Sequence, residues 1–538
     1  MKKIISFIVL AIFIVACTDN FESMNLNPTR ISPKSLEQEF NHIGTVFPTM
    51  FSGLHAEQRF ESLLYESFLT QITTNTDFMG TRNNTTYFVT WNTLWGQIYN
   101  SLMNPSLIVL RESDEGGYVV FSALIRLLRV VGLSKATSFY GPIVNKNYGS
   151  TSSVIYYDSE PEVYNSFFKT LDETMKIFAE NKDFKGLAKF DATYKGDLDK
   201  WMKFINSFRI RLAMRIVKAD PELAEKEFDK AMKDPAGIIL DNKDNFNVSL
   251  YGAKAHIAVV FFEWTDARMG AGYEEVLVGY KDPRLSKFFA PVTGGPEIYA
   301  DHPEYPYKGI ASGSFIDSKT HRQPWSTVPY DYFMNITFQR HMTAQEIHFC
   351  LAEAALRGWK TPKSAQAHYE DGVKSSFEDW GAGGADTYLA DNASLPLKNY
   401  VDPLQPKNNY TSRMQDPEAY TIKWRDDVSD EKKLERIMTQ KWIASFNNSM
   451  EMWADHRRTG YPKVHLARQN NSSEQWGIIS NDEPYPFPKR WPFVTAERNN
   501  NPVAVEDASI KYLGGKDKDL ISTPLWIHPD PGGPNFKP

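Results

Sequence analysis

The stretch LERIMTQKWIASFNNSMEMWADHRRTGYPKV, residues 434–464, decides the fold that we expect for this chain. Its spacing of apolar residues predicts a long, strongly periodic helix or helix pair over 430–458. Arg457 and Arg458 fall at the end of this helical stretch, where cationic side chains hydrogen-bond the last carbonyls and favour the helix dipole. We therefore assign these two arginines a structural role and expect paired helices to build the core.

Helical patterns recur on the N-terminal side of this stretch. An alanine-rich helix over 343–358 is followed by an antiparallel partner over 363–380, which together predict an αα-hairpin. Earlier amphipathic helices are predicted over 36–69, 91–103, 118–139, 163–180, 198–218 and 221–233. These pairs indicate tetratricopeptide-like packing, although no strict repeat of about 34 residues recurs.

Three regions carry little helical signal. Between about 245 and 340 a loop-rich insertion is predicted, in which short runs such as 256–262 fit strands. The stretch 386–429 is also loop-like, and the proline-rich segment of about 481–538 is expected to wrap the body as irregular coil and not as helix. The fold class that we expect is mainly α, with helix pairs, a variable loop-rich region and few short strands.

The first seventeen residues, MKKIISFIVLAIFIVAC, have the features of an export signal. Two lysines precede an apolar run that is too short to span a bilayer, and Cys17 closes it. The residues Ile14-Val15-Ala16 resemble a bacterial lipobox, in which the cysteine is acylated and the chain is cut before it. Several acyl chains hold a protein firmly on a membrane. A secretory signal with an incidental Cys17 and a short membrane anchor are the alternatives.

The sequence thus predicts a signal peptide over 1–16, a lipidated tether over 17–35 and a single domain over 36–538. The 538 residues are 42% hydrophobic and 23% charged, which indicates a globular protein with ample core. A net charge of −6 without a basic block gives no reason to expect nucleic acid as a partner. Of the two cysteines, Cys17 would carry lipid, so Cys350 has no disulfide partner and is expected to pack as a small apolar residue.

Several motifs jointly resemble the SusD/RagB family of nutrient-binding outer-membrane lipoproteins of Bacteroidetes. They are Gln440-Lys441-Trp442-Ile443-Ala444, Glu451-Met452-Trp453, Arg457-Arg458-Thr459-Gly460-Tyr461-Pro462, Asp282-Pro283-Arg284-Leu285, AQEIHFCLAEAALRGW at 344–359 and FESMNLNP at 21–28. The resemblance implies a mostly helical fold with four tetratricopeptide-like helix pairs and a loop-rich remainder. It also implies a place at the outer membrane, as a lid on a SusC-like TonB-dependent transporter that imports glycans or peptides.

No enzyme motif is recognisable in the sequence. It contains no His-Glu-x-x-His, Gly-x-Ser-x-Gly, Walker loop or Cys-x-x-Cys. His341 and His348 are seven residues apart on a predicted helix, so one face would show both to a metal ion. We interpret them instead as satisfied structural histidines, and we expect neither a metal nor a cofactor.

A binding site needs only a concavity, aromatic platforms and a few fixed polar groups. The polar stretch QITTNTDFMGTRNNTTY, residues 71–87, has the character of a binding loop. The candidate ligand-binding residues are Asp77, Arg82, Tyr87, Trp325 and Tyr330. The two charged residues would hydrogen-bond hydroxyl or carboxylate groups, and the three aromatic rings would stack on sugars. Alternatively, Trp325 and Tyr330 fill the core and Asp77 caps a helix.

The leading hypothesis is a non-catalytic, lipid-anchored protein of the outer membrane that faces the cell surface, binds oligosaccharide and delivers it to a SusC-like transporter. A peptide-binding member of the same family, a surface glycoside hydrolase and a purely structural partner of the transporter are the alternatives. The ligand itself cannot be read from the sequence, because one fold serves many functions.

Overall fold

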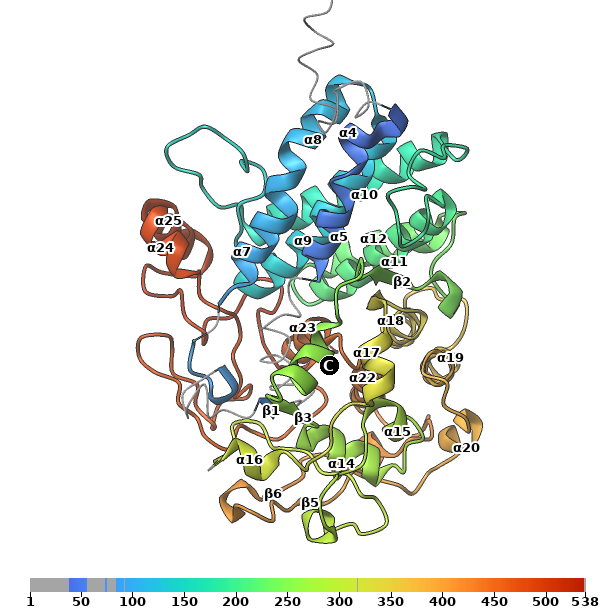
Figure 1. Cartoon of the computed structure of the whole chain (residues 1–538), viewed down its shortest axis with the longest axis vertical. Helices are drawn as coiled ribbons and strands as arrows, with labels where there is room; N and C mark the ends of the chain where they lie inside the picture. The colour runs from blue at the N-terminus through green and yellow to red at the C-terminus, as the bar shows by residue number, and fades with distance from the viewer. Residues whose placement is uncertain (1–37, 56–72, 75–83, 91, 317, 537–538) are drawn as a thin grey trace, which may run out of the picture.

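The computed structural model describes residues 38–55, 73–74, 84–90, 92–316 and 318–536. Helices from the first half of the chain fill the upper part of the molecule in Figure 1, and a more loop-rich body lies below them. In the described part of the chain, no helix combines the length and the apolar character needed to cross a bilayer. Cys17 and the predicted tether lie outside the described residues.

The upper body is a stack of helices, each packed on the next. Their bounds are η1 (Gln38–Phe40), α4 (Asn41–Gly44), α5 (Phe47–Leu54), α7 (Leu94–Ile98), η5 (Tyr99–Met103), α8 (Asn104–Glu115), α9 (Val119–Tyr140), α10 (Glu160–Glu180), α11 (Leu198–Ile216) and α12 (Pro221–Lys233). The short helix η4 (Asn84–Thr86) instead contacts the C-terminal segment, where the backbone N–H of Asn471 donates to the carbonyl oxygen of Thr86. Helix α8 packs on α9, α9 on α10, α10 on α11 and α11 on α12. This order confirms the predicted mainly helical fold built from paired neighbours.

Local sequence signals set the ends of these helices. Helix α10 begins at a capping box, in which Ser159 and Glu162 bond each other's backbone N–H groups. Helix α9 ends at Gly141, whose φ of 84° suits a residue without a Cβ atom. Helix α12 begins with Pro221 in its first turn, after Asp220 has accepted a hydrogen bond from the backbone N–H of Leu223.

The chain after Lys233 supplies the remaining helices. Their bounds are η6 (Asn242–Asp244), α13 (His256–Ala258), η7 (Val259–Glu263), α14 (Ala271–Gly279), α15 (Leu285–Phe288), η8 (Pro296–Tyr299), α16 (Lys319–Arg322), α17 (Tyr330–Asn335), α18 (Ala344–Leu356), α19 (Ala365–Asp379), α20 (Ala385–Leu389), η9 (Pro406–Asn408), α21 (Pro417–Tyr420), α22 (Asp430–Ala444), α23 (Ser449–Thr459), α24 (Thr495–Asn500) and α25 (Pro502–Tyr512). Helix α18 packs on α19, as the predicted hairpin requires, and also on α11 and α22. The stretch 434–464 is therefore a helix pair, α22 and α23, at the junction of the two halves.

The described strands are short and form two-stranded antiparallel sheets. They are β1 (Thr73–Thr74) with β3 (Ala267–Arg268), β2 (Phe246–Ser249) with β4 (Phe338–Met342), and β5 (Asn399–Tyr400) with β6 (Tyr410–Thr411). Strands β2 and β4 come from the two ends of the predicted loop-rich insertion, so their pairing closes that insertion at its base.

Two sequence-based expectations about local structure are wrong. The run 256–262 is not a strand but α13 continued by the π-helical η7, and Ile257, Val260 and Phe261 are buried at helical spacing. The proline-rich C-terminal segment is not coil throughout, because it contains α24 and α25. Pro502 does not prevent α25, since proline is tolerated in the first helical turn, where its missing N–H has no partner to lose.

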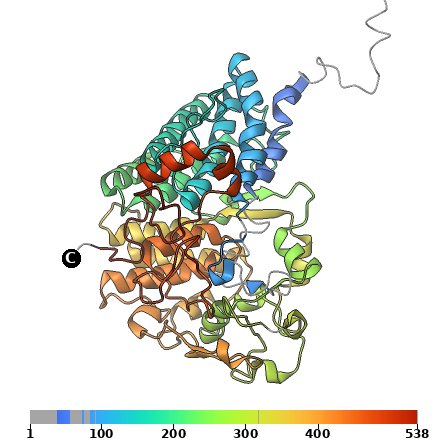
Figure 2. The ribbon, with the colours of Figure 1, turned by 90° about the vertical axis from the view of Figure 1, so that its left-hand side faces the viewer.

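The C-terminal segment wraps the body, as predicted. The backbone N–H of Trp491 donates to the carbonyl oxygen of Phe139 at 2.9 Å, and Arg490 donates to that of Tyr140 at 2.8 Å. Figure 2 shows α24 and α25 against the upper helices, where the hydroxyl of Tyr157 donates to Glu497 at 2.7 Å. The end of α9 thus takes its partners from residues about 350 positions later.

Buried ion pairs join α11, α18, α22 and α23. Arg458 is 1% exposed and donates to Glu353 on α18 and to Asp455 on its own helix, both at 2.8 Å. Lys441 on α22 also donates to Asp455, at 2.6 Å. Arg457 instead lies over the ring of Trp453 and donates to the carbonyl oxygen of Ser138 at 2.7 Å. The structural role expected for both arginines is confirmed, but their main partners are other elements and not the last carbonyls of α23.

Candidate functional site

Three segments that are distant in the sequence meet at one place in the lower body. Strand β1, in the predicted binding loop, pairs with β3, which follows η7, and α13 packs against α17. The backbone N–H of Met269 donates to the carbonyl oxygen of Ser326 at 2.8 Å, which fixes β3 to the segment before α17. The structure thus brings the predicted polar loop to the predicted aromatic segment.

A partly exposed group of aromatic rings marks this junction. It consists of Phe262, Trp264 and Tyr330, which we call the aromatic patch. The rings of Phe262 and Tyr330 meet edge to face with centroids 4.9 Å apart. Tyr330 is 57% exposed and Trp264 is 37% exposed, whereas most large aromatic side chains of the chain are buried. Such rings offer flat apolar faces to a ligand.

The backbone beside Trp264 is held in an uncommon conformation. Thr265 has a φ of 56°, which is unfavourable for a β-branched residue. Residues with such backbone angles cluster at ligand sites, where the surrounding structure holds them. The turn at Thr265 separates η7 from β3, so it sets where the ring of Trp264 lies relative to the sheet.

Polar side chains surround the aromatic patch. Lys319 donates to the carbonyl oxygen of Trp264 at 2.6 Å and forms an ion pair with Asp266. Glu263 forms an ion pair with Lys254. Arg268 holds β3 in place by donating to the carbonyl oxygen of Gln323 at 3.0 Å, and burial lowers its pKa to about 10. The patch therefore combines ring faces with charged groups that can hydrogen-bond a polyhydroxylated ligand.

The structure places Tyr330, alone among the predicted aromatic binding residues, at the surface. Trp325 is 1% exposed, and the guanidinium of Arg322 lies 4.2 Å from its ring centre. Arg322 is held in turn by Asp402 at 2.9 Å. The expectation that Trp325 stacks on sugars is wrong for this structure, because both of its faces are covered by protein, as in the alternative that we considered.

Tyr87 is also buried, with 1% of its surface exposed. It has a φ of 63°, and its ring meets that of Phe487 edge to face. Burial raises the pKa of its hydroxyl, and a hydrogen bond to the backbone of Ala467 opposes that shift. Tyr87 thus fixes the end of the polar loop to the C-terminal segment and offers no face for stacking, contrary to the expectation. Asp77 and Arg82 lie outside the described residues.

Sequence reasoning missed Phe262 and Trp264. Both lie in the run that was interpreted as a possible strand and its flank, FFEWTD at 261–266. Trp264 lies between Glu263 and Thr265-Asp266, and these polar neighbours are the feature of the sequence that could have indicated an exposed tryptophan.

His341 and His348 lie on different elements. His341 is on β4 and not on a helix, and its Nε2 lies 3.1 Å from Nδ1 of His55. His348 is on α18, where its Nδ1 lies 3.4 Å from Nδ1 of His368 on α19. The expectation that both histidines lie on one helix is therefore wrong, since the helix begins only at Ala344.

A polar cavity of about 490 Å³ lies far from the aromatic patch, between α8, α9 and α10. Its lining includes the cations Arg126, Arg129 and Lys146 beside aliphatic residues, and its aromatic lining residue, Phe167, is 1% exposed. This cavity offers no exposed ring to a sugar, so the aromatic patch is the better candidate site.

Comparison with known proteins places the chain in a family. The family model described as Susd and RagB outer membrane lipoprotein matches residues 23–528. The chain belongs to this SusD-like family. A comparison with the curated proteins finds no match. The resemblance noted from the motifs is thereby confirmed.

Solved structures agree with the family assignment. A chitin-binding SusD homologue from Flavobacterium johnsoniae is 33% identical, with a TM-score of 0.82 over 92% of this chain and 100% of that one. A SusD-like protein from Bacteroides thetaiotaomicron is 31% identical, with a TM-score of 0.80 over 91% and 99%. A SusD homologue from Bacteroides vulgatus is 29% identical, with a TM-score of 0.82 over 92% and 99%. The SusD-like scaffold thus spans nearly the whole chain.

Proposed function

We propose that this SusD-like protein is a lipid-anchored, non-catalytic receptor that binds oligosaccharide at the aromatic patch and delivers it to a SusC-like TonB-dependent transporter in the outer membrane. The observation that carries the proposal is the exposure of Tyr330, whose ring meets that of Phe262, and of Trp264, two residues after Phe262. Membership of an outer-membrane lipoprotein family supports the location. A chitin-binding homologue of similar structure supports a glycan as the ligand.

The chemistry of the patch favours binding over hydrolysis. A glycosidase needs an acid and a carboxylate at a set separation across the bound sugar. The carboxylates next to the patch, Glu263 and Asp266, are each engaged by a lysine. Stacking on the rings and hydrogen bonds from the surrounding charged groups require no such pair, and they suffice for reversible capture.

The experiment measures binding of the soluble chain from Thr18 onward to a panel of oligosaccharides by calorimetry. We expect affinity for at least one glycan class, and we expect Trp264→Ala and Tyr330→Ala each to weaken it about five-fold, because a ring contact contributes about 1 kcal/mol. Tyr156→Ala is the matched control, since Tyr156 is 44% exposed but lies next to Lys511 and away from the patch. Unchanged affinity in both patch variants would refute the assigned site.

Further measurements separate the other hypotheses. Release of shorter sugars that stops on Glu263→Gln or Asp266→Asn would establish a hydrolase and overturn the receptor. Binding of peptides but not of glycans would establish the peptide-binding alternative. We expect mass spectrometry of the native protein to find an acylated Cys17 at its N-terminus, and purification from outer membranes to recover a β-barrel transporter with it. Recovery without any barrel partner would contradict the delivery step.

A further inference from the structure

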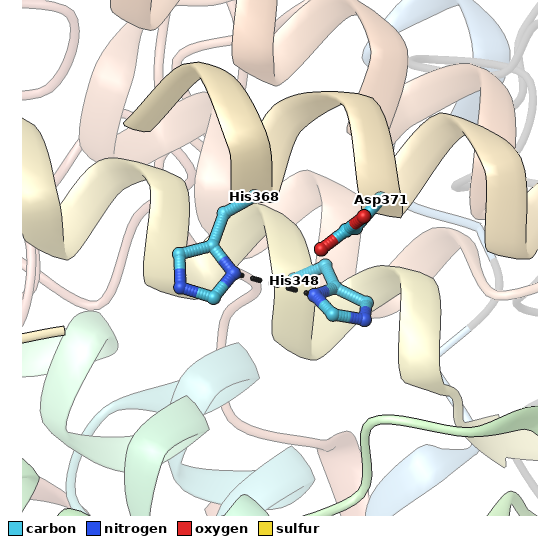
Figure 3. A group of neighbouring side chains, drawn as sticks. All are labelled: His348, His368 and Asp371. Atoms are coloured by element: carbon cyan, nitrogen blue, oxygen red, sulfur yellow. Dashed lines mark hydrogen bonds between the residues drawn. The ribbon is translucent and has the colours of Figure 1, made fainter. Parts of the chain in front are cut away.

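The hairpin of α18 and α19 brings two histidines and a carboxylate together, away from the aromatic patch. Figure 3 shows His348 of α18 facing His368 of α19, with the carboxylate of Asp371 beside them. One ligand atom from each of the three side chains lies within 4.8 Å of the other two. His368 and Asp371 are three residues apart, so they share one face of α19.

The spacing of the two rings fits a metal ion better than a direct hydrogen bond. The two Nδ1 atoms are 3.4 Å apart, beyond the usual range of about 2.7–3.2 Å for a hydrogen bond from nitrogen. Two nitrogens that each lie about 2.05 Å from a zinc ion, at a tetrahedral angle, are about 3.3 Å apart. The observed separation is therefore close to that of two imidazole ligands of one ion.

The surroundings of the rings also fit a ligand role. Nε2 of His348 faces the carbonyl oxygen of Leu240 at 3.3 Å, on the side of the ring away from His368, so Nδ1 is the nitrogen turned toward His368. His368 is 1% exposed, and its Nε2 has no hydrogen-bond partner among the described residues.

Asp371 supplies the negative charge and the access to solvent. Its side chain is 29% exposed, and its carboxylate forms an ion pair with Lys363 at 2.6 Å. Lys363 is itself 54% exposed, so its ammonium can leave for solvent when a divalent ion binds. The same exposure lets a water molecule complete the coordination.

We propose that His348, His368 and Asp371 bind a divalent transition-metal ion, zinc above all, and thereby clamp α18 to α19. Two nitrogens and one oxygen suit zinc, whereas calcium and magnesium prefer all-oxygen sites. Zinc with three protein ligands takes water at its fourth position. The site lies in the helical scaffold, so the proposal is independent of the proposed glycan binding.

A second group of candidate ligands, Glu274, Asp301 and His302, does not support a metal. The fully buried ammonium of Lys308 already lies 2.7 Å from Glu274 and 3.0 Å from Asp301. A cation of the chain therefore occupies the place that an ion would take, and this group serves as an internal control.

The experiment titrates Zn²⁺ into the chelator-treated, tag-free soluble chain by calorimetry, and uses Co²⁺ as a spectroscopic probe of coordination. We expect one Zn²⁺ per chain and the intense visible absorption of tetrahedral Co²⁺. Asp371→Asn and His368→Asn should each weaken Zn²⁺ binding by at least about 10-fold. Asp371 is partly exposed, so its variant should fold even if the buried His368→Asn variant does not.

Matched controls decide between this site and adventitious binding. Glu370→Gln changes the neighbouring carboxylate, which accepts a hydrogen bond from Gln366 at 2.8 Å, and it should leave Zn²⁺ affinity unchanged. Asp301→Asn should leave it unchanged as well. Zn²⁺ should raise the melting temperature of the wild type more than that of Asp371→Asn at the same Zn²⁺ concentration. The proposal is overturned if the wild type binds no Zn²⁺, if Asp371→Asn binds it as the wild type does, or if Asp301→Asn abolishes the binding.

Discussion

Replacing Glu353 by glutamine tests whether a buried ion pair holds α18 to α23. Glu353 on α18 is 1% exposed and accepts hydrogen bonds from Arg458 at 2.8 Å and from Arg357 at 2.7 and 3.0 Å. Glu353→Gln keeps the shape of the side chain but removes its charge. Breaking a buried pair costs about 3–5 kcal/mol, because the remaining charge stays buried without its partner. Arg458 retains Asp455 at 2.8 Å, so we expect a loss at the lower end, about 3 kcal/mol.

The assay is urea unfolding of the soluble chain followed by circular dichroism. Glu173→Gln is the matched control, since Glu173 is 55% exposed and 3.8 Å from Lys169, and we expect it to cost less than about 0.5 kcal/mol. Burial opposes ionisation of Glu353, but Arg458 and Arg357 together lower its pKa from the ordinary value of 4.5. A lowered pKa means that the stabilisation is present above about pH 4.5 and is lost as the pH falls below it, so the difference between wild type and variant should shrink in acid. A loss as small as that of Glu173→Gln at pH 7 would refute the reasoning.

Three further predictions concern single residues elsewhere in the chain. A Cβ atom on Gly279 would lie 2.5 Å from the carbonyl oxygen of Leu395, so Gly279→Ala should lower the free energy of unfolding by about 1–3 kcal/mol. Gly383 has open space around it, so Gly383→Ala should not lower the free energy of unfolding, and equal urea midpoints for the two variants would contradict this reasoning. Burial raises the pKa of Glu275 to about 8, so between about pH 4.5 and 8 the folded state binds a proton that the unfolded state has lost. The free energy of unfolding should therefore fall as the pH rises through this range, and Glu275→Gln should flatten the dependence in thermal melts at different pH values. Burial raises the pKa of the Cys350 thiol to about 12, so a thiol reagent should label it only after unfolding, and rapid labelling of the native protein would show that this helix opens.

Much of the helical scaffold could be predicted because its signals are local. The Gly141-Pro142 stop, the Pro221 start and the spacing over 118–139 each depend on residues within one or two turns. The same locality explains the failure at 256–262, where a short apolar run fits a strand or a buried helix equally well. It also explains α25, since Pro502 is compatible with the first turn of a helix.

The candidate site was only partly predictable, because exposure depends on residues far away in the sequence. Trp325 is covered through Arg322, which Asp402 holds, and Tyr87 is covered by residues near 467 and 487. Arg322 is three residues from Trp325, but nothing nearby in the sequence indicates Asp402, which holds it, or the residues that cover Tyr87. Tyr330 and Trp264 are exposed, unlike those two rings, because Tyr330 begins α17 and Trp264 follows the end of η7. Only the assembled fold places these two helix ends at the surface.

The wrapping C-terminal segment has a consequence for how the protein is made. The carbonyl groups at the end of α9 accept hydrogen bonds from Arg490 and Trp491. Asn535 donates hydrogen bonds to the first turn of α22 and to the last residue of α23. Arg490 and Trp491 are synthesised about 350 residues after α9, so the early helices must persist until the segment that completes them emerges. Contacts over such separations also close slowly. The end of α9 is therefore among the last parts of the fold to be completed, although its own residues are made early.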